Sequence, residues 1–151
     1  VFDDPKLIAL VADRLRNPES IRRARVFPYQ LLAAFRAAGG SMPRQITDAL
    51  QDALEIATEN VPALSGTVYV CPDVSGSMQS PVTGYRKGST STVRCVDVAA
   101  LVAATIVRRN RTAEILPFHD AAIENFTFNP RDSVMTNAKG EAAQILKAKL
   151  K

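Results

Sequence analysis

The sequence predicts an α/β fold in which an α-helical segment precedes an open sheet. Three observations support this: proline-led helical patterns over residues 1–60, a β-rich apolar run at 67–71, and an apolar helix at 93–107 that leads to a strand-like segment at 113–118. Short strands that alternate with helices are typical of open α/β sheets. A chain of 151 residues has room for one domain, or for one domain and part of another.

The composition narrows the class of protein. Hydrophobic residues make up 46% and charged residues 23%, as in folded globular proteins, and the formal charge of +4 permits an anionic partner without requiring one. The longest apolar stretch, 98–107, is about half of what a membrane span needs. Cys71 and Cys95 are too few for a disulfide scaffold and lack metal-type spacing, and we see no export signal. We therefore expect a cytoplasmic protein with reduced thiols.

Residues 1–60 are predicted to form short amphipathic helices. Pro5, Pro18 and Pro28 each suit the first position of a helix, where the missing N–H costs nothing, and Gly39-Gly40 suits a helix end. A fourth helix should begin near 41–43. Its outer face is acidic, with Asp48, Asp52, Glu55 and Glu59. The expected inward-facing residues are, helix by helix, Leu7, Val11 and Leu15; Leu31, Leu32 and Phe35; and Ile46, Leu50, Leu54 and Ala57. Such helices joined by tight turns are typical of stacked helical hairpins.

The pattern changes from residue 61 onward. Because the run 67–71 is apolar at nearly every position, we expect a strand that is buried on both faces. The segment 93–107 is apolar almost all the way round, which predicts a helix packed under other elements. The remaining expected elements are a loop at 79–90, strands at 113–118 and 123–128, and a helix at 138–150.

One polar motif follows the first expected strand. Asp73, Ser75 and Ser77 alternate in Asp-Val-Ser-Gly-Ser, and Gly76 allows a tight turn that can bring their oxygens together. Ligands bind at the carboxyl ends of strands in open α/β sheets, and an all-oxygen set of low charge suits Mg²⁺. The alternative is a polar turn in which the same side chains cap the next helix. The strand before the motif and the buried helix after it favour the metal site.

This order resembles the metal-ion-dependent adhesion site of the von Willebrand factor A domain. Four segments of this chain extend the resemblance: 71–78, 80–84, 96–103 and 129–137. Together they are similar to the TROVE family, which comprises the sixty-kilodalton Ro autoantigen and its bacterial relatives. Residues 27–32, before the acidic helix, resemble the last helical repeats of that family. The resemblance implies that 1–62 is the end of a HEAT-like helical ring. It implies that 63–151 is the first part of a von Willebrand factor A-like domain with a Rossmann-like open sheet.

The same resemblance implies an RNA-binding component of a Ro-type ribonucleoprotein rather than an enzyme. Members of the family bind small noncoding Y RNAs and misfolded or structured RNAs, and they are linked to RNA quality control and decay. The implied partners are therefore such RNAs and an exoribonuclease, with neither DNA nor a membrane among them. The resemblance assigns Asp73, Ser75 and Ser77 as ligands of Mg²⁺ or another divalent cation.

Two departures and two alternatives bear on this hypothesis. A complete adhesion site takes a Thr from a later loop and an Asp from a later strand, and nothing before Lys151, Thr136 included, matches either. We therefore expect weak or absent divalent binding by this chain.

One alternative function is a protein-interaction A domain whose metal receives an acidic group of a protein partner. The other, a hydrolase, would need His119 with Ser75 or Ser77, and neither serine lies in G-x-S-x-G.

Clustered arginines give a weaker signal. Positive charge gathers near the first two helices at Arg14, Arg16, Arg22, Arg23 and Arg25, which fits contacts to RNA phosphates. Residues 1–60 nevertheless hold eight basic and eight acidic side chains, so a solvated face with local ion pairs is the alternative. Arg108 and Arg109 suit the C-terminal end of the apolar helix, where positive charge complements the helix dipole.

Overall fold

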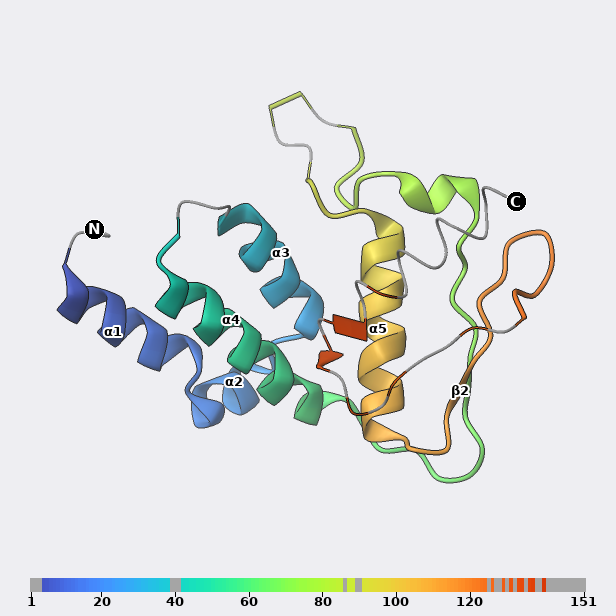
Figure 1. The fold of residues 1–151 in the computed structure, drawn as a ribbon, viewed down its shortest axis with the longest axis horizontal. Coiled ribbons are helices and arrows are strands. Elements are labelled where there is room, and N and C mark those ends of the chain that lie inside the picture. Colours follow the sequence, from blue (N-terminus) through green and yellow to red (C-terminus); the bar gives the residue numbers. More distant parts are fainter. Residues whose placement is uncertain are drawn as a thin grey trace. The chain divides into compact units, whose positions relative to one another are not determined.

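The computed structural model describes residues 4–38, 42–85, 87–88, 91–124, 126, 129, 131, 133–134, 136–137 and 140. The described chain is mostly helical, with a small parallel sheet of two strands (Figure 1). It divides into two compact units, residues 1–61 and 62–151. The helix expected at 138–150 lies outside the described residues, except for Gly140.

The first unit consists of short helices that begin where the prolines predicted. Its elements are α1 (Pro5–Leu15), α2 (Pro18–Ala24), α3 (Pro28–Ala38), α4 (Arg44–Ala57) and the 3₁₀ turn η1 (Thr58–Asn60). Side chains before two of the prolines cap the helices: Asp4 Oδ1 accepts from the Lys6 amide and Asn17 Oδ1 from the Ser20 amide, both at 2.8 Å. Such N-caps satisfy amides that have no partner within the helix, so the sequence defines these starts locally.

Helix α4 is the centre of this unit, because α1, α2 and α3 all pack against it. Its predicted inner face is confirmed: Ile46, Leu50, Leu54 and Ala57 are all buried. Ala49, Ala53 and Ala57 have no exposed surface, and the small side chains let neighbouring helices approach closely.

Of the stripe predicted for α1, Leu15 is confirmed, whereas Leu7 and Val11 are wrong. Leu7 and Val11 are 45% and 41% exposed. The face that packs on α4 instead carries Ile8, Ala12 and Leu15. The predicted positions are spaced i, i+4 and i+8 and the observed ones i, i+4 and i+7. Both spacings are helical and both include Leu15, so periodicity alone could not choose between the two stripes.

The second unit contains β1 (Tyr69–Val70), the 3₁₀ turn η2 (Gly76–Gln79), α5 (Cys95–Arg109) and β2 (Glu114–Ile115). The two strands pair in parallel, Tyr69 with Glu114 and Val70 with Ile115, as the strand–helix–strand order predicts. Both strands are shorter than expected. Of the residues expected as a third strand, Ile123, Glu124 and Phe126 are described and lie outside any strand.

The expectation of a strand buried on both faces is also wrong. Tyr69 and Glu114 are exposed, whereas Val70 and Ile115 are half-buried. Residues that pair in register point to the same face of a sheet, and successive residues point to opposite faces. One face of the two-stranded sheet is therefore partly covered and the other is open.

Helix α5 provides most of the core of the second unit. Its buried residues are Val96, Asp97, Ala100, Leu101, Ala103, Ala104, Thr105 and Val107, while Val102 is 44% exposed. After its last turn, the buried Asn110 donates from Nδ2 to the Ile106 carbonyl at 2.8 Å and accepts from the Leu64 amide at 2.7 Å. Asn110 thus ties the end of the helix to the chain leading into β1. Among the described residues, no helix is both long and apolar enough to cross a bilayer.

Candidate functional site

The polar motif lies where the two strands end. Beyond β1, Phe118 N–H donates to the Pro72 carbonyl at 3.1 Å and Val74 N–H donates to the Phe118 carbonyl at 2.8 Å. These bonds form an isolated parallel bridge between Asp73 and Phe118. Val74 has no exposed surface and packs with Val96 of α5. The backbone of Asp73 is therefore fixed at the carboxyl edge of the sheet.

The motif turn brings the three predicted site residues into one small region. Asp73 Oδ1 accepts from the Ser75 amide at 2.8 Å, and the hydroxyl oxygens of Ser75 and Ser77 lie 3.0 Å apart. Asp73 and Ser75 are half-buried, while Ser77 is exposed at the start of η2. The bond from the Ser75 amide is the usual one in an Asx-turn, so the geometry is compatible with a polar turn as well as with a metal site.

The donor set fits a hard divalent cation. Mg²⁺ binds oxygens at about 2.0–2.1 Å in an octahedron, so adjacent ligands lie roughly 3 Å apart, which is the spacing of the two hydroxyls. A carboxylate and two neutral hydroxyls supply only one negative charge, and the remaining positions would be filled by water or by an acidic ligand. No cluster of three or more His, Cys, Asp or Glu side chains with metal-site geometry occurs in the described part of the chain.

An ion-pair network supports η2 and the start of α5. The side chain of Asp97 is 2% exposed and accepts from the Arg94 amide, from Nε and from Nη2, at 2.9, 3.1 and 2.9 Å. The remaining terminal nitrogen, Nη1, donates to Gln79 Oε1 at 2.8 Å. This hydrogen bond joins η2, the turn that contains Ser77, to the first turn of α5.

The Asp97 hydrogen bond raises the pKa of Arg94, the Coulombic attraction of the same carboxylate adds to this effect, and burial partly opposes it. Arg94 therefore keeps its positive charge throughout the ordinary pH range. Sequence analysis missed the network. The spacing of Arg94 and Asp97 is that of a capping box, which could have indicated the pair, but no local pattern points to Gln79.

His119 and Asp120 interact with each other rather than with the serines. The imidazole Nδ1 accepts from the Asp120 amide at 2.6 Å, and the Asp120 carboxylate lies 3.5 Å from the same nitrogen. Among the described residues, His119 makes no hydrogen bond to Ser75 or Ser77, whose hydroxyls contact each other. The nucleophile–base contact that a hydrolase needs is therefore not formed at this edge.

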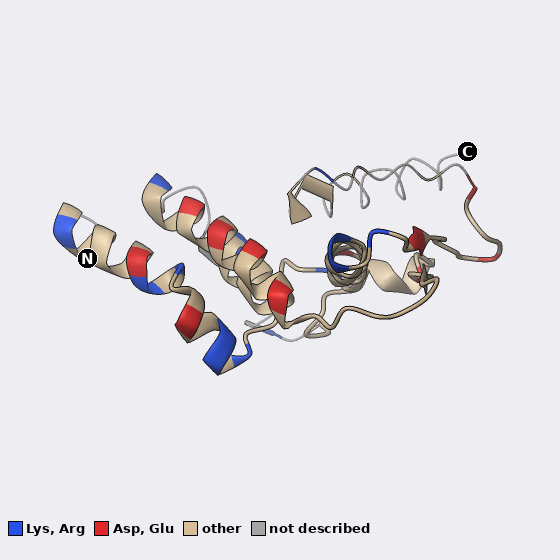
Figure 2. Cartoon of the chain, turned by 90° about the horizontal axis from the view of Figure 1, so that it is seen from below, with Lys and Arg blue, Asp and Glu red and all other residues tan. Residues whose placement is uncertain are grey.

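The arginines of the first unit fall into two groups. Arg22 donates from Nε and Nη2 to Glu59 Oε2 at 2.8 and 2.6 Å, and Arg16 lies 2.6 Å from Asp13 and 4.0 Å from Asp52. Figure 2 shows both signs of charge on the helices of the first unit, with the acidic residues gathered in a row along α4. Arg14, Arg23 and Arg25 are exposed and have no ion pair with a described residue. The local ion pairs considered from the sequence are confirmed for the first group only.

The two units together define a class of architecture: a helical segment joined to a strand–helix–strand segment with a polar turn after its first strand. Comparison with solved structures finds a similar fold in the crystal structure of the Ro (Rsr) protein of Deinococcus radiodurans, with a TM-score of 0.68 and 23% sequence identity. The match covers 93% of this chain and 29% of that protein. The resemblance to a bacterial Ro protein is thus confirmed at the level of the fold. Neither the known protein families nor the curated proteins contain a match.

Proposed function

We propose that this chain is part of an RNA-binding protein of the Ro type. In this proposal, residues 1–62 form the end of a HEAT-like ring and 63–151 form the first part of a von Willebrand factor A-like domain in a cytoplasmic ribonucleoprotein. Its ligands would be Y-type noncoding RNA and misfolded or structured RNA, in RNA quality control and decay. The observation that carries the proposal is the structural match to a Ro protein over 93% of the chain. The motifs at 71–78 and 129–137 support the same conclusion.

The charge distribution offers a physical basis for RNA binding. Exposed guanidinium groups that form no ion pair remain available to phosphates, and phosphate contacts provide a large share of the affinity of such proteins. Arg14, Arg23 and Arg25 meet this condition among the described residues, whereas Arg16 and Arg22 are engaged with carboxylates. Exposed Phe27 and Tyr29, whose ring centroids lie 6.4 Å apart, stand next to Arg25 in the sequence and offer surfaces for stacking.

The test is a titration of the 151-residue chain with a fluorescein-labelled stem–loop RNA that carries a single-stranded tail, followed by anisotropy at several salt concentrations. We expect the affinity to fall steeply as salt rises, because phosphate contacts release counterions. Arg23→Gln and Arg25→Gln should each lower the slope of log K against log salt by ~0.7–0.9. Arg22→Gln is the matched control, because Arg22 is already paired with Glu59, and it should change the salt slope less. Absent binding, or binding that salt does not affect, contradicts the proposal.

Within the same proposal, Asp73, Ser75 and Ser77 would hold Mg²⁺ or another divalent cation. The spacing of the two hydroxyls supports this assignment. A bound cation would supply an electrophilic centre that accepts a carboxylate or phosphate oxygen from a partner.

This centre also supports the second candidate function, a protein-interaction domain that binds an acidic side chain through the metal. A chelator separates the two candidates, because a metal-bridged protein complex should dissociate in EDTA, whereas RNA held by arginines should dissociate in salt.

A further inference from the structure

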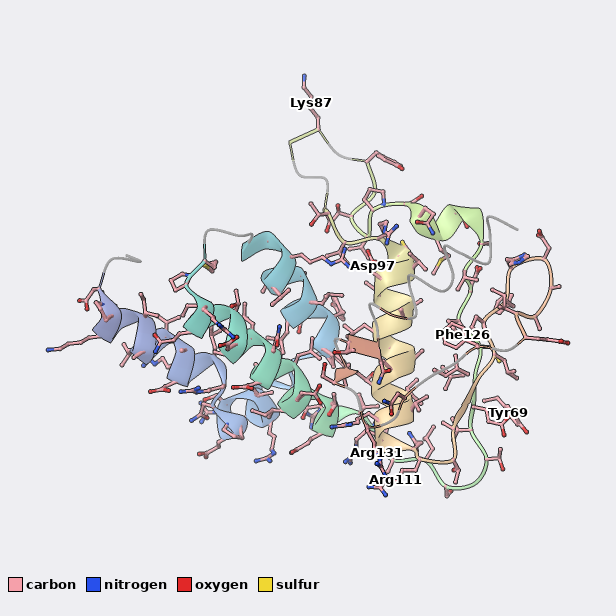
Figure 3. The ribbon with its side chains drawn as sticks, in the orientation of Figure 1. Tyr69, Lys87, Asp97, Arg111, Phe126 and Arg131 are labelled. Atoms are coloured by element: carbon pink, nitrogen blue, oxygen red, sulfur yellow. The ribbon has the colours of Figure 1, made fainter. Side chains whose placement is uncertain are left out.

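The C-terminal end of α5 carries a cavity that the proposed function does not use. Its volume is about 370 Å³, and Val107, Arg108, Arg111 and Arg131 line it. Figure 3 shows Arg111 and Arg131 close together below the last turn of α5. We call this the arginine cavity. Three arginines from two separate segments thus line one cavity, which the sequence alone did not indicate.

Helix capping accounts for only part of this charge. Arg108 and Arg109 lie in the last turn of α5, where positive charge complements the helix dipole. The Ile106 carbonyl is already satisfied by the amide and side chain of Asn110. Arg111 and Arg131 lie beyond the helix, so helix capping does not explain their position. Positive charge from three arginines at one cavity favours an anionic ligand there.

A second cavity adjoins the first and differs from it in chemistry. It measures about 350 Å³ and shares Val107 and Arg111 with the arginine cavity. Its other lining residues are Ala113, Glu114, Ile115, Leu116 and Phe126. Among these described residues, apolar and aromatic side chains occur with one carboxylate, that of Glu114, a combination that suits a planar ring carrying an amino group. We call this the apolar cavity.

We propose that the two cavities together bind one nucleotide unit of single-stranded RNA, with its phosphate in the arginine cavity and its base in the apolar cavity. Arginine guanidinium groups match phosphate oxygens in geometry as well as in charge. Each cavity falls within the range of small-ligand sites, about 300–1,000 Å³, so the pair offers more room than an inorganic ion needs. This proposal rests on the proposed RNA binding in one respect: RNA is the molecule that supplies the nucleotide.

The experiment uses the 151-residue chain with three probes: a labelled single-stranded RNA oligonucleotide, adenosine monophosphate and inorganic phosphate. Binding of the oligonucleotide is followed by anisotropy, and binding of the two small probes by NMR chemical-shift changes. Arg111→Gln and Arg131→Gln should each weaken the oligonucleotide about fivefold to tenfold and reduce its salt slope by ~0.7. Arg111→Lys and Arg131→Lys keep the charge and should lose less.

Two variants test whether the effect is local. Arg109→Gln removes the same charge from the same end of α5 but from a side chain outside both cavities, so it should leave nucleotide binding nearly unchanged. Glu114→Gln removes the one acidic side chain among the described residues that line the apolar cavity. It should strengthen inorganic phosphate binding about twofold by relieving repulsion, and it should weaken adenosine monophosphate relative to phosphate. Circular dichroism and thermal unfolding confirm that each variant is folded.

The outcomes distinguish this inference from the proposed function. If the chain binds RNA but the cavity variants and Arg109→Gln behave alike, the inference is overturned while RNA binding stands. If adenosine monophosphate binds at the cavity and RNA does not, the cavity is a free-nucleotide site and the proposed RNA function fails. If none of the three probes binds, both are overturned.

Discussion

Arg94 and Asp97 form the most enclosed ion pair of the described chain, with the Asp97 side chain 2% exposed and that of Arg94 32% exposed. The carboxylate accepts three hydrogen bonds from one residue, and that residue also holds Gln79. The pair therefore connects two adjacent features: the N-terminus of α5 and the turn that carries the metal motif.

Asp97→Asn should destabilise the chain by about 1–3 kcal/mol, because Asp97 is buried and an amide group in its place removes the negative charge and sets an NH2 donor against the donors of Arg94. Urea unfolding followed by circular dichroism measures the change. The matched control is Asp48→Asn, which removes an exposed carboxylate 3.7 Å from Arg44 and should cost less than ~0.5 kcal/mol. Equal effects of the two substitutions would show that the Arg94–Asp97 pair contributes no more to the free energy of unfolding than an exposed ion pair does.

Magnesium should bind this chain more weakly than about 1 mM, because Asp73 is the one carboxylate in the candidate ligand set. NMR titration with MgCl₂ measures it, with shifts expected at the amides around Ser75 and Ser77. These shifts should disappear in Asp73→Ala and persist in Asp120→Asn, a fully exposed carboxylate at the same edge of the sheet. Millimolar or tighter binding that Asp73→Ala abolishes would mean that further ligands complete the site.

Arg25→Gly should stabilise the chain by ~0.5–1 kcal/mol while it weakens RNA binding. Arg25 ends α2 with φ 47° and ψ 44°, a left-handed conformation in which a side chain is strained and glycine is not. Arg25→Ala keeps the strain and should lose RNA affinity without the gain in stability. Denaturant unfolding and RNA anisotropy on the same two variants measure both effects, and equal stabilities would contradict the strain argument.

Ala53→Leu should lower the free energy of unfolding by about 1–3 kcal/mol. Ala53 has no exposed surface and packs with Ile21 and Ala57, so three additional carbons would force α2 and α4 apart. Gln51→Leu places the same side chain on the exposed face of α4 and should stay within ~0.5 kcal/mol of the original chain. A small effect of Ala53→Leu would indicate that the helices can separate without loss of packing.

The sequence predicted helix starts and buried helix faces correctly where only one interpretation of the local pattern was available. Each proline-led helix start was correct, because proline and its preceding cap act within a single turn. The inner face of α4 was correct because its opposite face is acidic. On α1, Leu7 and Ile8 begin two apolar stripes that both end at Leu15, and contact with α4 selects the second. A tertiary contact of this kind is not encoded in periodicity.

The same distinction applies to the site. The motif Asp73, Ser75 and Ser77 was visible because its members are neighbours in the sequence, and the parallel pairing of β1 with β2 followed from the helix between them. The hydrogen bond from Arg94 to Gln79 connects residues fifteen positions apart in the sequence. Arg111 and Arg131, which line the same cavity, are twenty positions apart. Neither pairing has a local signature, so both required the fold.

The length of α5 has a consequence for how the second unit could operate. Its fifteen residues span roughly 22 Å, with the Arg94–Asp97 pair beside the motif turn at one end and the arginine cavity at the other. A single nucleotide cannot reach both ends, so the proposed cation site and the proposed nucleotide site would bind their ligands independently. Stripping the cation should accordingly leave nucleotide affinity untouched, while one extended strand that touches both would gain avidity from their fixed spacing.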